Sequence, residues 1–233
     1  KNIYEVINIQ IKNNQKAVDI SLNLAHEYFY NLGTIEEIPS EKIEFKAVNQ
    51  ITKTEQTVMV NKWKLNGTQI QKNFTIVDSI KSFSVETATI FQKIEDGYLR
   101  VSTNVMKTDG NRAVGTFIPN DSPVIQAIER GETFRGRAFV VNDWYLTAYE
   151  PIYINGEIKG ILYVGLKEKD LTELKEFLNA KKYYDRGYPY IVNENGDFVY
   201  HPTSPGGNIF EEEFFQVMLD NKEEKTHKYR YVW

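Results

Sequence analysis

The N-terminal part of the chain carries apolar residues with the period of a helix. They recur mostly at spacings of three, four or seven, with Gln, Asn and Lys between them: Ile3, Ile7, Ile11, Val18, Leu22, Ala25 and Phe29. Because an α-helix turns once in about 3.6 residues, this spacing gathers the apolar side chains on one face. The pattern predicts a long amphipathic helix over residues 1–32, which Gly33 ends and Pro39 prevents from resuming.

Beyond residue 42 the pattern changes to alternation, which is typical of strands. Ile43, Phe45 and Ala47 fall on one side of the first strand. Strands are expected over 57–64, 88–94, 98–105 and 158–166, with hairpin turns at Asn66-Gly67, Glu95-Asp96-Gly97 and Asn155-Gly156. A short helix from Asp121 or Ser122 to Arg130 interrupts them, since Pro123 suits a first helical turn and Gly131 a helix end.

The stretch 135–152 is the most informative part of the chain. It predicts two antiparallel strands around a tight turn at Asn142-Asp143, with Arg, Tyr and Thr placed among apolar residues. The strand over 158–166 follows directly after the Asn155-Gly156 turn. Together these segments predict a curved antiparallel sheet that holds a small polar ligand.

The C-terminal part predicts a second, smaller unit. Residues 167–184 are charged, with Leu171, Leu174 and Leu178 on one face, which is typical of a helical connector. Strands over 188–193 and 197–201, a Pro/Gly loop and a helix over 211–220 follow. This order amounts to half of an α+β domain, and both ends of the chain look cut from a longer protein.

Composition narrows the function. The 233 residues are 41% hydrophobic and 13% aromatic, which supports real cores, and the net charge of −4 comes from mixed charges without a basic stripe for nucleic acid. There is no cysteine, and His26, His201 and His227 are scattered, so the pattern predicts no metal or other cofactor. No apolar run is long enough to cross a membrane, and no spacing supports a catalytic set, so we expect no enzyme.

Several motifs together resemble one family. They are 87–92 (Thr-Ala-Thr-Ile-Phe-Gln), 100–105 (Arg-Val-Ser-Thr-Asn-Val), 110–116, 122–124, 131–132, 136–138, 149–152 (Tyr-Glu-Pro-Ile) and 160–165 (Gly-Ile-Leu-Tyr-Val-Gly). The chain resembles the double Cache sensor domains, with PAS-like sheets, of bacterial and archaeal chemoreceptors and sensor histidine kinases. Downstream, 196–203 and 229–233 resemble the second, membrane-proximal module, which is incomplete here.

The resemblance implies an α+β fold with a long N-terminal helix and two PAS-like modules with antiparallel sheets. The implied boundaries are 1–34 for the signalling helix, 35–168 for the membrane-distal ligand-binding module, 169–186 for a helical connector and 187–233 for the partial proximal module. It also implies a homodimer formed through the N-terminal helix, and a periplasmic or extracellular domain of a membrane-anchored receptor.

Arginines are the first candidates for ligand contacts, because the guanidinium group binds a carboxylate through two parallel hydrogen bonds. Arg137 lies on a strand among apolar residues, where it is either a ligand clamp or part of a surface ion pair. Arg112, in a loop, is placed to reach over the pocket, although loop arginines are usually solvated. Arg100, on a strand with Thr103, has a weaker claim of the same kind.

Tyr145, Thr147 and Tyr149 alternate along one strand and therefore share a face. That face either lines a pocket with hydroxyl groups and rings or covers an exposed side of the sheet. Phe91 is either core or an apolar pocket wall, and Trp144 at the turn is a packing or lid residue. His201, before Pro202, is a candidate for a separate proximal site: either a ligand contact or structural.

These features predict a ligand-sensing domain that binds a small organic anion, such as a short carboxylate, in the distal module. One alternative is an amino acid or amine ligand, which calls for an acidic residue such as Asp143 or Glu150. Another is a structural or adhesion module without a pocket. The sequence leaves open whether the receptor serves chemotaxis or is a histidine kinase.

Overall fold

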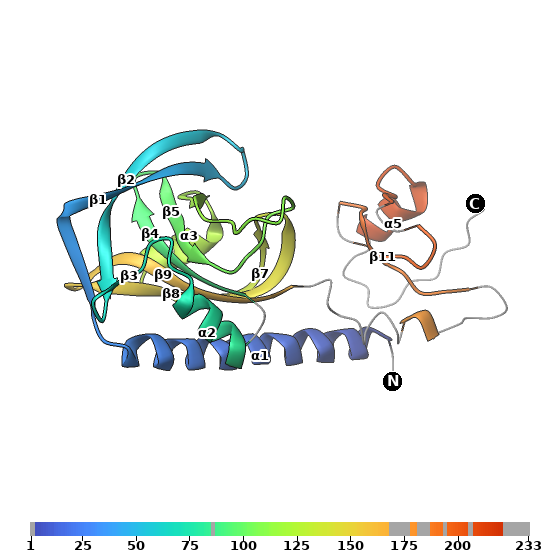
Figure 1. Cartoon of the computed structure of the whole chain (residues 1–233). Coiled ribbons are helices and arrows are strands. Elements are labelled where there is room, and N and C mark those ends of the chain that lie inside the picture. Colours follow the sequence, from blue (N-terminus) through green and yellow to red (C-terminus); the bar gives the residue numbers. More distant parts are fainter. Residues whose placement is uncertain are drawn as a thin grey trace. The chain divides into compact units, whose positions relative to one another are not determined.

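The computed structural model describes residues 3–84, 87–167, 178–180, 187–192, 195–204 and 207–220 (Figure 1). The chain divides into two compact units, Lys1–Asp170 and Leu171–Trp233. The first unit is α+β, as the sequence predicts, and it consists of a long helix beside a large sheet. Among the described helices, none combines the length and apolar character that a membrane crossing requires.

The N-terminal helix α1 (Ile3–Asn31) confirms the first prediction. Gly33 follows its end with φ +126°, a conformation that residues with a Cβ rarely adopt. The predicted apolar face is confirmed where side chains are described, because Val18, Leu22, Ala25 and Phe29 are all buried. They pack on the sheet, along which α1 runs (Figure 1).

Within the described residues, the sheet has nine strands in the order β3-β2-β1-β6-β5-β4-β9-β8-β7. They are β1 (Ile35–Asn49), β2 (Glu55–Leu65), β3 (Thr68–Gln69), β4 (Thr87–Ile94), β5 (Gly97–Thr103), β6 (Thr116–Pro119), β7 (Phe134–Val140), β8 (Asp143–Ile154) and β9 (Glu157–Lys167). The expectation of a wholly antiparallel sheet is wrong at one point. β1 pairs with β6 in parallel at Val48 and Asn49, because the β1–β2 hairpin lies alongside a strand from a separate hairpin.

Two of the predicted hairpin turns are confirmed in detail. Asn66-Gly67 and Asn155-Gly156 both have positive φ at each residue, as a type I′ turn requires. The turn predicted at Asn142-Asp143 is wrong by one residue. Val140 pairs with Asp143, so the turn residues are Val141 and Asn142, and Val141 adopts φ +60° despite its branched Cβ.

Two short helices belong to the first unit. Helix α3 (Pro123–Glu129) confirms its prediction, since Ser122 is its N-cap and its side chain accepts a hydrogen bond from the Val124 N–H. Helix α2 (Thr75–Phe83) is not predicted by the sequence pattern. Its N-cap residue is Phe74, which offers no capping side chain and therefore no sequence signal.

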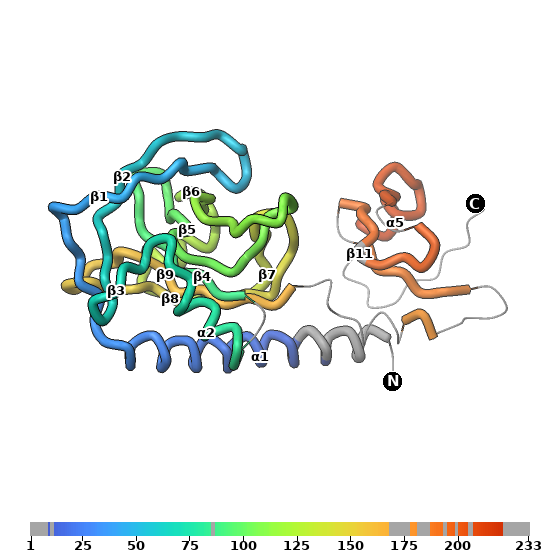
Figure 2. Tube along the Cα trace, in the orientation of Figure 1, coloured from blue at the N-terminus to red at the C-terminus, as the bar shows by residue number. Residues whose placement is uncertain are grey.

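The β1–β2 ribbon arches over the strands that follow it (Figure 2). Its turn reaches the β7–β8 turn, where Gln50 Nε2 donates to the Phe139 carbonyl at 3.4 Å. Lys53 Nζ donates to the Val141 carbonyl at the same distance. These contacts join the two ends of a curved sheet around its interior.

The sheet separates two apolar cores. One contains the buried residues of α1 and α2 with alternate residues of the strands, such as Ile90, Ala148 and Leu162. The other contains the buried residues of α3 with the intervening strand residues, such as Phe91 and Tyr149. Each central strand therefore contributes to both cores, which is why the strands read as nearly continuous apolar runs.

The second unit contains β10 (Ile191–Val192), β11 (Phe198–Tyr200) and α5 (Glu213–Asp220), which agree with the two predicted strands and the predicted helix. A small core contains Ile209, Phe214 and Phe215. The predicted connector over 169–186 and the strand over 229–233 lie outside the described residues, apart from a helical segment at 178–180.

Candidate ligand-binding site

The second core contains an unusual number of polar side chains on one sheet face. Register places them together: Tyr149 pairs with Tyr163, Tyr163 with Thr89, and Thr89 with Thr103. Paired residues of antiparallel strands share a face. The set, which we call the inner face, consists of Thr87, Thr89, Phe91, Arg100, Thr103, Tyr145, Thr147, Tyr149 and Tyr163, all of them buried.

Arg100 lies at the centre of the inner face and is 0% exposed. Its guanidinium group lies over the Phe91 ring, 4.8 Å from the centroid, and Nη1 donates to the Thr116 hydroxyl. Within the described part of the chain, Nε and Nη2 have no hydrogen-bond partner. Burial lowers the pKa of Arg100, and nearby tyrosines oppose this effect. A buried cation with two unsatisfied donors is costly unless an anion pairs with it.

Further aromatic rings lie beside Phe91, the ring that contacts the arginine. The ring centroids of Tyr149 and Tyr163 are 4.7 Å apart, and each lies 6.3–6.4 Å from that of Phe91. Burial raises the pKa values of both tyrosines well above the ordinary value, so their phenols stay neutral donors at physiological pH. The Tyr163 hydroxyl lies 3.1 Å from the Thr87 hydroxyl.

Threonine hydroxyls occupy the rest of the inner face. Thr89 and Thr103 share a hydrogen bond of 2.6 Å between their Oγ1 atoms. Thr147 Oγ1 donates to the Gly136 carbonyl at 2.7 Å, which ties β8 to β7. Side chains that can both donate and accept therefore share this face with the buried Arg100, a combination that suits a small polar anion.

Six residues predicted from the sequence meet on this face. They are Arg100, Thr103, Phe91, Tyr145, Thr147 and Tyr149. The sequence did not identify the inner-face residues Tyr163, Thr87 and Thr89, nor Thr116, the hydrogen-bond partner of Arg100. Alternation would have found Thr89, since it lies two residues from Phe91 on β4.

Arg137 and Trp144 do not join this group. Arg137 pairs in register with Leu146, whose side chain belongs to the core on the opposite face of the sheet. The exposed guanidinium group of Arg137 stacks on Trp144, 4.1 Å from the ring centroid. Both side chains therefore lie away from Arg100.

Arg112 is held by helix α2. Its Nη1 and Nη2 donate to the two carboxylate oxygens of Asp78 at 2.8 and 2.9 Å, and Nη1 also donates to the Thr103 carbonyl. The guanidinium group lies over the Phe74 ring. Because both nitrogens bind an internal carboxylate, the structure gives Arg112 a partner that does not depend on a ligand.

Each of the two acidic candidates already has a partner within the protein. Asp143 Oδ2 is 3.0 Å from Lys167 Nζ. Glu150 follows Tyr149 and therefore points to the other side of β8, where its Oε1 lies 2.9 Å from His26 Nδ1 on α1. Among the described residues, no group of three or more potential metal ligands is gathered.

His201, in the second unit, is buried among aromatic rings, with the Phe198 centroid 4.4 Å away. Its Nδ1 accepts hydrogen bonds from the backbone N–H groups of Thr203 and Ser204 at 3.2 and 2.9 Å. Nδ1 is therefore unprotonated, and the ring orders the turn that follows it. A structural role accounts for these contacts.

A long helix against a curved sheet whose buried face is polar and aromatic defines a PAS-like sensor domain. The chain belongs to the Cache 3/Cache 2 fusion domain family, whose model matches residues 1–233. This confirms the resemblance that the sequence motifs indicate.

Other comparisons add little to the family match. Among curated proteins, none matches the chain. Among solved structures, the chain is similar to "the extracellular domain of the putative histidine kinase mmHK1S-Z2", with 18% identity and a TM-score of 0.34. The similarity covers 59% of this chain and 60% of that chain, so the match spans three fifths of the solved domain.

Proposed function

We propose that the first unit senses a small organic anion, a short carboxylate, and that Arg100 binds it. The observation that carries the proposal is the pair of unsatisfied donors on a fully buried guanidinium group. Nε and one Nη atom form one edge of the guanidinium fork, which matches the two oxygens of a carboxylate. The charge of the ligand offsets the cost of burying the arginine.

The surroundings of Arg100 favour a compact ligand. Every inner-face side chain is buried, the guanidinium group lies over the Phe91 ring, and the rings of Tyr149 and Tyr163 lie beside Phe91. A ligand of a few heavy atoms fits this setting better than an extended one. The neutral phenols add hydrogen-bond donors for a second polar group, such as a keto or hydroxyl oxygen.

Strand β8 connects this site to α1. Tyr149 faces Arg100, and the next residue, Glu150, faces His26 on the helix. Two further contacts tie α1 to the same region: Gln15 Nε2 donates to the Thr147 carbonyl at 3.3 Å, and Arg135 Nε lies 3.4 Å from Asp19 Oδ1. A ligand that shifts β8 therefore shifts α1, which we propose carries the signal.

We further propose that the domain lies outside the cytoplasm as part of a membrane-anchored receptor, and that two copies associate through α1. A chemotaxis receptor and a histidine kinase both fit this assignment, and the role is binding rather than catalysis. The alternative amine ligand is less well supported, because Glu150 lies on the other side of β8, against His26, and Asp143 already pairs with Lys167. An adhesion module gives no reason for a buried, unpaired arginine.

Calorimetric titration with acetate, propionate, pyruvate and lactate tests the proposal. We expect saturable binding of at least one of them, and an affinity at least ~100-fold lower for Arg100→Met, because two charge-assisted hydrogen bonds are lost. Arg137→Met is the matched control, since that arginine is exposed on the other face. Binding that survives Arg100→Met and disappears with Arg137→Met would transfer the site to the opposite face and contradict the proposal.

A further inference from the structure

Strand β2 has an open edge in the described part of the chain. On one side it pairs with β1 over most of its length, whereas on the other side the only strand among the described residues is the two-residue β3, at Lys64 and Leu65. The segment 55–61 therefore has a strand neighbour on one side only. Open edges present unpaired N–H and C=O groups and are natural sites for another strand.

Hydrogen bonds at the end of β2 that pairs with β3 show which backbone groups point to this edge. The Trp63 N–H donates to Gln71 Oε1, and Gln71 Nε2 donates to the Asn61 carbonyl, at 3.1 and 3.0 Å. Since backbone groups alternate between the two sides of a strand, the odd-numbered residues face away from β1. Thr57 and Met59 therefore present their N–H and C=O groups to the open side.

The same glutamine shows that the edge accepts an amide as a partner. Gln71 is 1% exposed, and its side-chain amide both donates to and accepts from β2, as a peptide group of a neighbouring strand does. Gln92 Nε2 also donates to the Asn61 carbonyl, at 2.8 Å. Side chains thus complete the edge at Asn61 and Trp63, and this completion stops before Met59.

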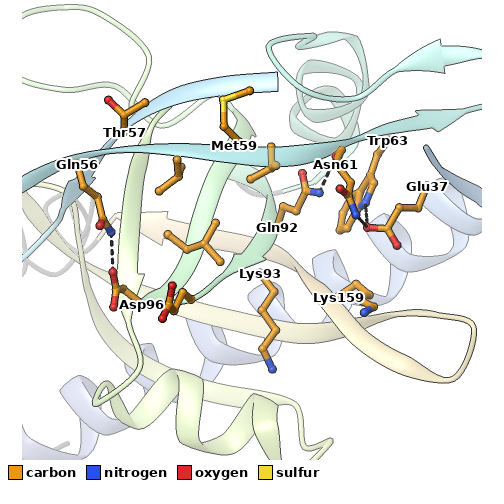
Figure 3. A pocket seen from close by; sticks show the side chains of 14 residues that line it. Glu37, Gln56, Thr57, Met59, Asn61, Trp63, Gln92, Lys93, Asp96 and Lys159 are labelled. Atoms are coloured by element: carbon orange, nitrogen blue, oxygen red, sulfur yellow. Dashed lines mark hydrogen bonds between the residues drawn. The ribbon is translucent and has the colours of Figure 1, made fainter. Parts of the chain in front are cut away.

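A hollow of about 470 Å³ lies beside the open edge (Figure 3). Residues 56–61 of β2 form one wall, and the β4–β5 turn with Lys159 forms the other. At one end Gln56 Nε2 donates to Asp96 Oδ2 at 2.8 Å, and Gln92 closes the other end. The part of β2 between these two ends, residues 57–60, is roughly 13 Å long, which suits a segment of three or four residues.

The sequence of this edge lacks the usual protection against pairing. The run 56–61 (Gln-Thr-Val-Met-Val-Asn) has no charge and no proline, whereas Glu55 and Lys62 stand just outside it. Met59 is 54% exposed. Natural proteins place charges or proline on open edges to prevent pairing. An uncharged edge that borders a hollow therefore favours pairing with another strand at this place.

The charges around the hollow favour a basic partner. Its lysines, Lys93 and Lys159, bind Glu129 and Glu157, which lie outside the lining. Among the described residues, two of its acidic side chains accept hydrogen bonds from neutral amides: Glu37 accepts from Asn61 Nδ2, and Asp96 accepts from Gln56 Nε2. The acidic side chains therefore give the hollow an excess of negative charge.

We propose that the β2 edge binds an extended peptide segment of a partner protein, which adds as a short strand beside Thr57 and Met59 and carries a basic side chain. Val58, Val60 and Ile94 line the hollow and provide an apolar floor for a second side chain of the segment. The hollow is bridged at both ends and walled by the β4–β5 turn, so it admits one segment and not the sheet edge of a second copy. This site is independent of Arg100.

The test uses the whole chain and two display libraries of random nine-residue peptides, one with a fixed central lysine and one with a fixed central glutamate. Peptides enriched on the wild-type protein are measured by titration against Met59→Pro and Met59→Ala. Proline removes only the outward N–H of Met59, which takes no part in pairing with β1. Alanine keeps that N–H and truncates the side chain.

We expect enrichment from the lysine library, similar affinity for the wild type and Met59→Ala, and about ten-fold weaker binding to Met59→Pro. Thr57→Pro, compared with Thr57→Ala, repeats the test at the other outward N–H. Failure of both libraries, preference for the glutamate library, or equal binding to the proline variants would each overturn the proposal.

Two further measurements keep the test decisive. Thermal unfolding checks that the proline variants are folded; if Met59→Pro does not fold, the comparison of Thr57→Pro with Thr57→Ala decides the test. Titration with n-butylamine checks the charge alone. An affinity for the amine equal to that for the peptides would assign the hollow to a small cation and overturn the peptide site.

Discussion

Replacing Arg100 by methionine should stabilise the ligand-free protein while it abolishes binding. Arg100 is 0% exposed, and within the described residues two of its donors have no partner. Each unsatisfied buried donor costs about 1–3 kcal/mol. Methionine has a similar reach and no charge, so it removes these costs together with the desolvation of the cation.

The substitution also removes favourable contacts. The bond from Nη1 to the Thr116 hydroxyl is worth about 1.5–3 kcal/mol, and the contact with Phe91 about 1–2 kcal/mol. Thr116 is not left stranded, because its hydroxyl also donates to the Ala113 carbonyl. We expect a net gain of about 1–4 kcal/mol, the range found when buried ionic groups are replaced by apolar ones.

Urea unfolding in a buffer free of carboxylates measures this gain, and the fluorescence of the buried Trp63 is a suitable signal. Adding a saturating carboxylate should stabilise the wild type and leave Arg100→Met unchanged. The difference in free energy of unfolding between the two proteins should therefore shrink or change sign. Arg137→Met controls for the loss of an arginine on the surface. A loss of more than about 1 kcal/mol in Arg100→Met without ligand would refute the reasoning, since it would show that the buried donors are satisfied.

Two further predictions concern β8 and β9. Burial raises the pKa of Glu150 above its ordinary value of 4.5, and His26 opposes this shift. The folded state therefore binds the proton of Glu150 more tightly than the unfolded state does. The resulting contribution to the free energy of unfolding is fully present below pH 4.5 and is lost as the pH rises through the folded-state pKa. The stability of Glu150→Gln relative to the wild type should therefore increase with pH in thermal unfolding, and a pH-independent difference would count against this. In Gly165→Ala the new Cβ would lie 2.1 Å from the Tyr163 hydroxyl, so the phenol must move. The affinity for a carboxylate, measured by calorimetry, should then fall about ten-fold. An unchanged affinity would show that Tyr163 is not part of the site.

The sequence predicted the elements well wherever a turn or helix cap contains residue types that favour that conformation. Asn155-Gly156 and Ser122-Pro123 are such signals, and both are confirmed. Helix α2 was missed because Phe74 occupies its N-cap position. The β7–β8 turn was misplaced because Val141 adopts positive φ, which a sequence rule assigns to Asn or Gly.

The candidate site was predicted in part for a different reason. Alternation correctly grouped Tyr145, Thr147 and Tyr149, because a strand's period is a local property. It did not rank Arg100 above Arg137, because burial depends on strands that are distant in sequence. A register shift between Ile90 and Phe91 on β4 brings Phe91 opposite Arg100, and no local pattern encodes that irregularity.

In the proposed function, the alternation along β8 separates ligand recognition from the link to α1. Tyr149 faces Arg100 while its neighbour Glu150 faces His26. Substitutions at odd-numbered positions can therefore retune which ligand is recognised, while even-numbered positions keep the link to the helix intact. A lineage of such receptors could exchange one chemical preference for another without rebuilding its output, whereas a one-residue slip of this strand would lose both at once.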